Sequence, residues 1–353
     1  MFIKRILIIT FFILITFPTF EIHPQELSDY LHLDKNKLPK GCGSCHKGHG
    51  IFNTPMLPEQ KEKFCFRCHG YDDIRNLMKQ MGYLSDDVDL TNIEKEFGKP
   101  YHHPIENTGI HQYGEALPEL NPSTPRHSEC IDCHNYHYVK KDDITFGIKG
   151  FNSQGFIVQN INSEYELCFK CHSNSANLPV DQTNKATMFN LLNPSYHPVV
   201  GSGKNSDVPS LIFPLTSLSM IKCSDCHGNN NLDGPKGPHG SDYEHILKMN
   251  FNHDDGPESE FAYQLCYQCH NRNSILSNES FFYHNLHISI VGASCRTCHN
   301  PHGSIQYTHL IDLESPSIGH SDSGNLDFID LGNKTGQCFL NCHSRNHDPA
   351  TYP

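Results

Sequence analysis

Sixteen cysteines constrain this chain of 353 residues more than any other feature, because each belongs to a motif of two cysteines followed by a histidine. Seven of these motifs have the spacing Cys-x-x-Cys-His, and the eighth, Cys338-Phe-Leu-Asn-Cys342-His343, is longer by one residue. On a helical turn, positions i, i+3 and i+4 share one face. A motif of this spacing therefore presents two thiols and one imidazole on the same side of a short helix.

This motif is the attachment signature of haem c. The two thiols form thioethers with the porphyrin, and the adjacent histidine reaches the iron. Zinc ribbons and disulfides also use many cysteines, but neither requires a histidine directly after the second cysteine. We therefore predict eight haem c groups with their iron. The attachment cysteines are Cys42, Cys45, Cys65, Cys68, Cys130, Cys133, Cys168, Cys171, Cys223, Cys226, Cys266, Cys269, Cys295, Cys298, Cys338 and Cys342. The proximal histidines are His46, His69, His134, His172, His227, His270, His299 and His343.

The motifs alternate between two types, which indicates an internal repeat. The first type has mostly small or polar residues around the thiols, as in Gly41-Cys-Gly-Ser-Cys-His46. The second type has an aromatic residue after the first cysteine, as in Leu167-Cys-Phe-Lys-Cys-His172. We expect four haem doublets that form one continuous haem chain. Their predicted ranges are 21–100, 101–195, 196–282 and 283–353.

The composition predicts a sparse side-chain core. Apolar residues make up 37% of the chain, tryptophan is absent, and there are 22 prolines and 25 glycines. This apolar share is low for a soluble domain, but haem plates fixed by covalent and iron bonds can replace a side-chain core. The expected fold is a haem-organised multihaem cytochrome, mostly coil with short α-helices and little or no β-sheet.

Local sequence patterns predict where two helices begin and where one strand lies. Ser163-x-x-Glu166 predicts a capping box at the start of a helix that contains Cys168. Asp255-x-x-Glu258 predicts the start of a longer helix that runs to Cys266. The best strand signal is short and lies at 155–159.

The N-terminus has the pattern of an export signal. Lys4 and Arg5 precede an apolar run from Ile6 to Phe17, which is too short to span a bilayer. Pro18-Thr19-Phe20 lacks the small residues of a cleavage site, so an uncleaved anchor is the alternative to a signal peptide at 1–20. We expect an exported protein, in the periplasm or at the extracellular, outer surface, because thioether attachment of haem takes place outside the cytoplasm.

The net charge of −12 bears on the partners of the chain. A negative surface disfavours nucleic acid, so we expect no nucleic-acid partner. The expected partners are other redox proteins, such as quinol-linked or periplasmic cytochromes, an outer-membrane conduit or a mineral acceptor. Self-assembly is a further alternative.

Eighteen histidines remain besides the proximal ones, and recurrence in the repeat selects the candidate distal iron ligands. One set follows the first-type motif, as in His134-Asn-Tyr-His137, and consists of His49, His137, His239 and His302. A second set comes from a Tyr-His element between doublets and consists of His103, His197 and His287, with His284 as the alternative to His287. For the eighth ligand, His347 and His320 are the candidates.

The other histidines have weaker support. His245 and His309 recur six and seven residues after His239 and His302, so they are either ligands or neighbours of ligands. A solvated or structural role is as well supported as ligation for four more histidines, His23, His32, His111 and His127. Methionines have no equivalents in the repeat, so we expect all-histidine ligation and low potentials.

The chain resembles the multihaem cytochromes with doubled Cys-x-x-Cys-His motifs, as an octahaem member. The residues that carry the resemblance are Cys295-Arg-Thr-Cys-His-Asn-Pro-His-Gly-Ser304, Gly237-Pro-His-Gly-Ser241 and Tyr196-His-Pro-Val199. The alternation of motif types extends it over nearly the whole chain. The resemblance implies bis-histidine haems, packed as alternating stacked and perpendicular pairs, that transfer electrons. The longer motif at Cys338 departs from the pattern.

Electron transfer is the favoured function, so no catalytic residues are expected and the protein is expected not to be an enzyme. A multihaem reductase of nitrite, hydroxylamine or tetrathionate is one alternative, and it requires one open haem with acid–base residues over it. Against it, the chain has no Cys-x-x-Cys-Lys variant and more histidines than the haems need. A subunit of an extracellular cytochrome filament is the other alternative.

Overall fold

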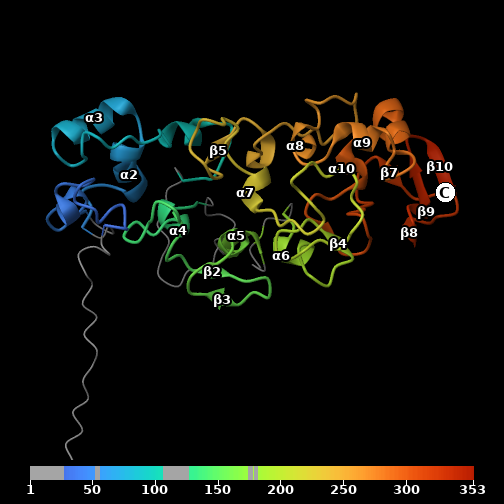
Figure 1. The fold of residues 1–353 in the computed structure, drawn as a ribbon, viewed down its shortest axis with the longest axis horizontal. Helices are drawn as coiled ribbons and strands as arrows, with labels where there is room; N and C mark the ends of the chain where they lie inside the picture. Colours follow the sequence, from blue (N-terminus) through green and yellow to red (C-terminus); the bar gives the residue numbers. More distant parts are fainter. Residues whose placement is uncertain (1–27, 52–55, 106–126, 174–177, 179–181) are drawn as a thin grey trace, which may run out of the picture.

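The computed structural model describes residues 28–51, 56–105, 127–173, 178 and 182–353. These residues form an elongated body in which the order of the chain follows the long axis (Figure 1). α2 (Lys61–His69) and α3 (Asp72–Gln80) lie at one end, and the C-terminal strands lie at the other. The predicted signal at 1–20 falls outside the described residues. Within the described ranges, no helix has the length and apolar character needed to cross a membrane.

The helices are short, and many of them contain an attachment motif. α4 (Cys130–Cys133), α7 (Cys223–Cys226) and α10 (Cys295–Cys298) begin at the first cysteine of a first-type motif and end at the second. α2 and α5 (Glu164–His172) contain a whole second-type motif and end at its histidine. The remaining helices are α6 (Lys185–Met188), α8 (Gln264–Tyr267), α9 (Arg272–Leu276), the 3₁₀ turns η1 (Gly41–Ser44), η2 (Glu94–Gly98) and η3 (Glu244–Ile246), and the π-helical turn η4 (Leu286–Val291).

Side-chain caps hold these short helices at their first turn. The capping box predicted for α5 is confirmed, because the Glu166 carboxylate accepts a hydrogen bond from the Ser163 N–H at 3.0 Å. The helix predicted to start near Glu258 is wrong in its extent, since α8 begins only at Gln264. The Glu258 carboxylate is instead bound by Arg272 and by the Tyr267 hydroxyl, so it does not cap a helix.

Small two-stranded pairs join segments that lie far apart in the chain. β1 (Tyr101–His102) pairs with β5 (Gly240–Ser241), and β4 (Ser195–Tyr196) pairs with β6 (Gly303–Ser304), both antiparallel. Each of these pairs connects a Tyr-His element to the His-Gly-Ser segment of a later doublet. A third pair joins two neighbouring segments, β2 (Gly150–Phe151) and β3 (Ile157–Val158), and β3 lies within the strand predicted at 155–159.

A four-stranded antiparallel sheet closes the C-terminal end of the body. In it β9 (Thr335–Cys342) pairs with β7 (Ile318–Gly319), β8 (Asp327–Gly332) and β10 (Arg345–Tyr352). The sequence patterns did not predict this sheet. The expected fold class is confirmed, because the described residues are 24% helical and 15% strand, are otherwise mostly coil, and form short helices and small sheets.

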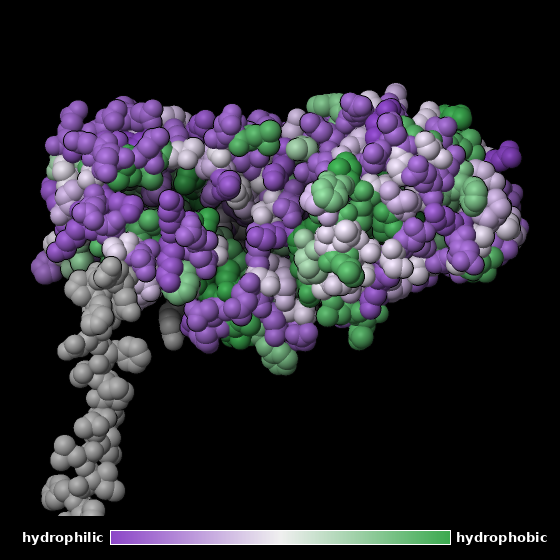
Figure 2. Space-filling view, in the orientation of Figure 1, coloured by the Kyte–Doolittle hydropathy of each residue, from purple (hydrophilic) through white to green (hydrophobic). Residues whose placement is uncertain are grey.

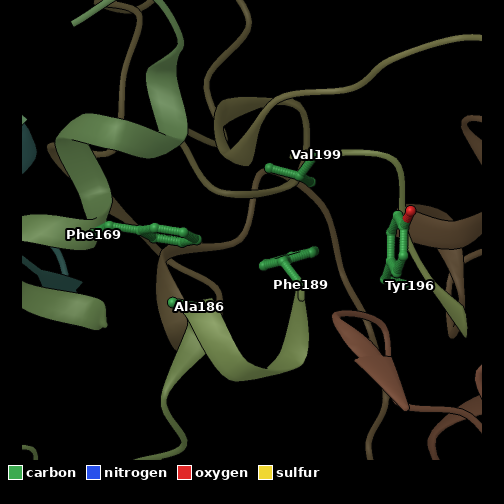
Figure 3. Packing of buried hydrophobic residues seen from close by; sticks show 5 residues of the cluster. All are labelled: Phe169, Ala186, Phe189, Tyr196 and Val199. Atoms are coloured by element: carbon green, nitrogen blue, oxygen red, sulfur yellow. The ribbon is translucent and has the colours of Figure 1, made fainter. Parts of the chain in front are cut away.

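The apolar core of the described chain is divided into small clusters. One contains Phe169, Ala186, Phe189, Tyr196 and Val199, and Figure 3 shows Phe169 pointing from α5 toward Phe189. Each of the three clusters packs against at least one motif cysteine, namely Cys223 in the first, Cys68 in the second, and Cys266 and Cys295 in the third. An apolar group attached at these thiols would therefore extend the core.

The surface is mostly hydrophilic on the face shown in Figure 2. Apolar side chains gather in a hollow left of the centre of this face and over a wider area right of the centre (Figure 2). Several large apolar side chains are almost fully exposed, including Leu192 at 91% and Phe213 at 92%. Apolar side chains are thus shared between the clusters and the surface, as expected for a chain with a sparse core.

Candidate haem sites

Seven motif histidines each face a second histidine from elsewhere in the chain. Their ring centres lie 6.0 to 6.4 Å apart. A metal–imidazole bond is about 2 Å long, so two imidazoles on opposite sides of one ion have ring centres about 6 Å apart. The observed separations therefore fit an iron ion held from both sides. The facing pairs are His46–His137, His69–His32, His134–His239, His172–His103, His227–His302, His270–His197 and His299–His284.

Backbone carbonyls hold the second ring nitrogen of three first-type motif histidines. The Nδ1 atom of His134 lies 3.1 Å from the Ile144 carbonyl oxygen. The Nδ1 atoms of His227 and His299 lie 2.8 and 2.9 Å from the carbonyl oxygens of His245 and His309. When Nδ1–H donates to a carbonyl, Nε2 keeps the lone pair that binds a metal, and the orientation of the ring is fixed.

The facing histidines of the second-type sites are held in the same way. His32 Nδ1 lies 2.8 Å from the Tyr136 carbonyl oxygen, and His103 Nδ1 lies 2.7 Å from that of Pro238. His197 Nδ1 contacts the carbonyl oxygen of Pro301. The carbonyls of Pro238 and Pro301 belong to the Pro-His-Gly segments that pair with the Tyr-His elements, so the small β pairs also orient these rings.

Burial keeps the facing imidazoles neutral. It lowers the pKa of His69, His172, His239 and His270 to about 4, and that of His284 to about 3. Removal of a charged ring from water is the main cause of each shift, and neighbouring histidines add to it. The neutral imidazole is the form that binds a metal, and the lowered pKa of these five rings favours that form.

The thiols of successive motifs lie next to one another. Hydrogen bonds join Cys130 to Cys65, Cys168 to Cys223 and Cys266 to Cys295, and they raise the pKa of the first-named thiol in each pair. These close contacts connect the second motif of one doublet to the first motif of the next. Within the doublets, electrostatic contacts link Cys45 to Cys68, Cys168 to Cys133, Cys226 to Cys266, and Cys298 to Cys342. No disulfide joins the sixteen cysteines, all of which lie in the described part of the chain.

Two segments of the chain match the family model of the doubled CXXCH motif, residues 37–73 and 218–274. Each segment contains two attachment motifs, and the histidines that face these motif histidines lie outside the matched segments. These doubled motifs indicate a multihaem c-type cytochrome. No curated protein and no solved structure gives a match. The arrangement of facing histidines in this chain is therefore described from its own geometry.

Six of the seven facing pairs follow one rule along the chain, which we call the pairing rule. A first-type motif histidine is faced by the post-motif histidine of the next doublet, as His46 is by His137. A second-type motif histidine is faced by a histidine that precedes its own doublet, as His172 is by His103. In the last doublet, which no other doublet follows in this sequence, His299 is faced by His284 from the segment before it.

Five of the predicted distal candidates of the cytochrome face a motif histidine, namely His103, His137, His197, His239 and His302. His49, His287 and His347 do not face one among the described residues. His49 is exposed, and the ring of His287 stacks against Phe281 with centres 6.0 Å apart. The structure brings His284 to His299 in place of His287.

Sequence reasoning gave no preference to His32, which the structure places against His69. A signal was present, because Tyr30-x-His32 has the same spacing as Tyr101-x-His103. Both segments precede the doublet whose second-type histidine they face. The two segments differ at the middle position, where Tyr30-x-His32 has leucine and Tyr101-x-His103 has histidine. Tyr30-x-His32 therefore lacks the adjacent Tyr-His pair that marks the other elements.

The eighth motif of the cytochrome is arranged differently from the others. Cys338 and Cys342 both lie in the extended strand β9. A strand rises about 3.3 Å per residue, which separates these two positions by about 13 Å, whereas the other motifs span about one helical turn. The thiol spacing in this conformation does not fit attachment of one porphyrin.

His343 is also oriented differently from the other motif histidines. Its backbone has a left-handed φ of 48°, and its Nε2 lies 3.4 Å from the Asp255 carboxylate. The same carboxylate accepts hydrogen bonds from the Thr297 and Ser317 hydroxyls. The nitrogen that would bind iron is thus turned to a carboxylate, and in the described chain no second histidine faces His343. The residues of this motif, as the structure arranges them, do not fit a haem.

Proposed function

We propose that this protein transfers electrons along a chain of eight covalently attached haem c groups, of which the eighth, at Cys338 and Cys342, requires β9 to leave its extended form. The observation that carries the proposal is the set of seven motif histidines that each face a second histidine at 6.0 to 6.4 Å. Bound haem supplies a one-electron iron couple. At each of these sites, the motif cysteines would hold the porphyrin covalently and the two histidines would hold the iron.

Histidines on both sides favour electron transfer over catalysis. A site with an imidazole on each side has no open position for a substrate, whereas a reductase needs one. The carbonyl contacts at Nδ1 keep several of the rings in place. A rigid site changes little between oxidation states, and this property suits transfer of electrons.

The contacts between successive motifs support a single path. Thiol–thiol hydrogen bonds join the second motif of each doublet to the first motif of the next, and electrostatic interactions between thiols link the two motifs within each doublet. The order of the sites in space therefore follows the order in the sequence, along the long axis of the body (Figure 1). Electrons would enter and leave at opposite ends of this path.

Low-temperature EPR of the oxidised holoprotein tests the proposal. We expect low-spin ferric signals from the sites with two facing histidines, and no change in these signals when nitrite or hydroxylamine is added. A stoichiometric high-spin signal that responds to either molecule would contradict electron transfer as the sole function and favour a reductase.

We also propose export to the periplasm or cell surface, with other redox proteins as partners. The apolar run after Lys4 and Arg5 supports export, and the net charge of −12 supports partners that carry a complementary basic surface. Fractionation of expressing cells tests the location. Recovery of haem-loaded protein in the periplasmic or secreted fraction is expected, and its retention in the cytoplasm would contradict the proposal.

A filament subunit is a second candidate, and His49 favours it. By the pairing rule, a post-motif histidine faces a motif histidine, but His49 faces none in the described part of the chain. His49 is exposed, so it is available to a second copy of the chain. Negative-stain microscopy of the holoprotein tests this candidate, because filaments that are lost in a His49→Ala variant would support it and dispersed particles would exclude it.

A further inference from the structure

Outside the facing histidine pairs, three further side chains converge on the surface near the middle of the chain. The ligand atoms of Glu244, His245 and His253 lie within 4.8 Å of one another. Glu244 and His245 belong to η3 and are exposed, whereas His253 lies in the loop before α8 and is half-buried. We propose that this cluster, the Glu244 site, binds a divalent transition-metal ion of the zinc class.

The geometry suits one ion. The His245 and His253 rings are stacked, with centres 5.2 Å apart and planes inclined by 15°. Three donors bound to one ion with bonds of about 2 Å lie no more than about 4 Å apart, so a small change in side-chain angles closes the cluster. Two imidazoles and one carboxylate suit zinc and its neighbours better than magnesium or calcium, which prefer oxygen ligands alone.

The backbone of His245 is fixed while its ring is directed to the cluster. Its carbonyl oxygen accepts the hydrogen bond from His227 Nδ1 at 2.8 Å, and the next carbonyl, of Ile246, accepts from the Gly228 N–H at 2.7 Å. His245 also has a left-handed backbone, with φ 58°, which is uncommon for a residue other than glycine. The segment that carries two of the ligands is thereby held against the neighbouring motif.

The local charge favours a cation. The carboxylates of Glu244 and Asp254 place negative charge near His253, and the Arg296 guanidinium places positive charge near it. The two carboxylates outnumber the one guanidinium, which is itself paired with Asp312 at 3.0 Å, so the charged side chains near His253 favour a cation. Part of the charge of a divalent ion would be neutralised there.

The last doublet provides a matched control in His309. The His309 carbonyl oxygen accepts from His299 Nδ1 at 2.9 Å, and its backbone is left-handed with φ 56°, as at His245. The His309 ring, however, lies 3.1 Å from the Asp330 carboxylate and 3.2 Å from the Asn205 amide, with no second histidine beside it in the described chain. It shares the backbone of His245 without the cluster.

Zinc binding to the holoprotein tests the proposal. Chelator-treated protein is titrated with Zn²⁺ by calorimetry, and bound zinc is counted by elemental analysis after dialysis. The variants are His245→Asn, His253→Ala and Glu244→Gln, with His309→Asn as the control. Asparagine is used at 245 and 309 because it tolerates a left-handed backbone.

We expect one zinc ion per chain to be lost in His245→Asn and His253→Ala, and the affinity to fall at least tenfold in Glu244→Gln. His309→Asn should bind zinc as the unchanged protein does, and Mg²⁺ should not compete. An unchanged haem spectrum in each variant shows that the chain is folded. Equal zinc binding in all variants, or no stoichiometric zinc in the unchanged protein, would overturn the proposal.

Discussion

Histidines next to each other in sequence have different environments in this chain, and the difference lies in what holds the ring. His103 faces His172 and has its Nδ1 at 2.7 Å from the Pro238 carbonyl oxygen, whereas the Nδ1 of His102 lies 2.9 Å from the carbonyl oxygen of His103. The ring of His102 contacts Phe97. Only one of the two neighbours is therefore placed to bind iron.

Replacement of His103 by alanine should convert one site from low-spin to high-spin, because the iron loses one of its two imidazoles. The His102→Ala variant is the control and should keep every low-spin signal. EPR of the two oxidised variants gives the comparison. High-spin iron in His102→Ala with none in His103→Ala would show that the assignment is reversed.

The choice between His284 and His287 is open to the same kind of measurement. His284 faces His299 at 6.3 Å between ring centres, and His287 Nδ1 is bonded to the Tyr283 carbonyl oxygen of its own turn. We expect one high-spin site in His284→Ala. His287→Ala should retain the spectrum of the unchanged protein at the site of His299, and a high-spin signal from that site in this variant alone would favour His287 as the ligand.

At the scale of elements, polar side chains connect the short helices that the sparse core leaves weakly held. Arg272 at the start of α9 donates to both oxygens of Glu258, at 2.8 and 2.5 Å, and the Tyr267 hydroxyl of α8 donates to the same carboxylate at 3.0 Å. The Glu258 side chain is only 6% exposed. Charge-assisted bonds to a buried acceptor are stronger than exposed ion pairs.

Glu258→Gln should lower the free energy of unfolding by about 2 kcal/mol, because it leaves the Arg272 guanidinium without its charged partner. The hydrogen bond from Arg272 lowers the pKa of Glu258. The carboxylate therefore stabilises the fold above its unfolded pKa of about 4.3 and loses this effect as the pH falls through the lower folded value. Thermal melts followed by circular dichroism should show a smaller acid destabilisation in Glu258→Gln. Equal acid sensitivity in both proteins would exclude this role.

Local elements could be predicted from the sequence, and long-range pairs could not. The capping box of α5 and the helical turns of the first-type motifs depend on neighbouring residues, so the pattern contains the necessary information. The contact of His32 with His69 and that of His227 with His302 depend on how distant segments pack, which spacing does not encode. The sheet around β9 was missed for a further reason, because a cysteine motif was expected to be helical there and the strand pairing overrides that preference.

At the scale of the whole molecule, the attachment sites lie in the order of the sequence, and the C-terminal motif is the exception in geometry. Six of the seven facing pairs obey the pairing rule, and the seventh, at His299, takes its partner from the segment before its own doublet. The eighth motif is in a strand, with its histidine bonded to Asp255. The number of haems is therefore the most informative property of the intact protein.

Intact-mass spectrometry and pyridine haemochrome absorbance of the holoprotein should give eight haems per chain, and Cys338→Ser/Cys342→Ser should give one fewer. Attachment at this motif requires β9 to leave its extended form, so the circular dichroism of the double variant should show more strand than that of the unchanged protein. A count of seven in both proteins would mean that the eighth motif does not receive haem.

The pairing rule has a consequence for how the molecule is made. With the proposed export from the N-terminus, each of the first three first-type motifs would reach the far side of the membrane before the histidine that faces it, since that histidine lies in the next doublet. Maturation would then pass through intermediates in which the motif histidine is present and the facing histidine is not. Each such site would stay reactive until the next doublet is exported. A stalled or truncated chain would keep one such site without its facing histidine, near the C-terminal end of the exported part. Cells that make this protein would need to recognise and degrade such a chain.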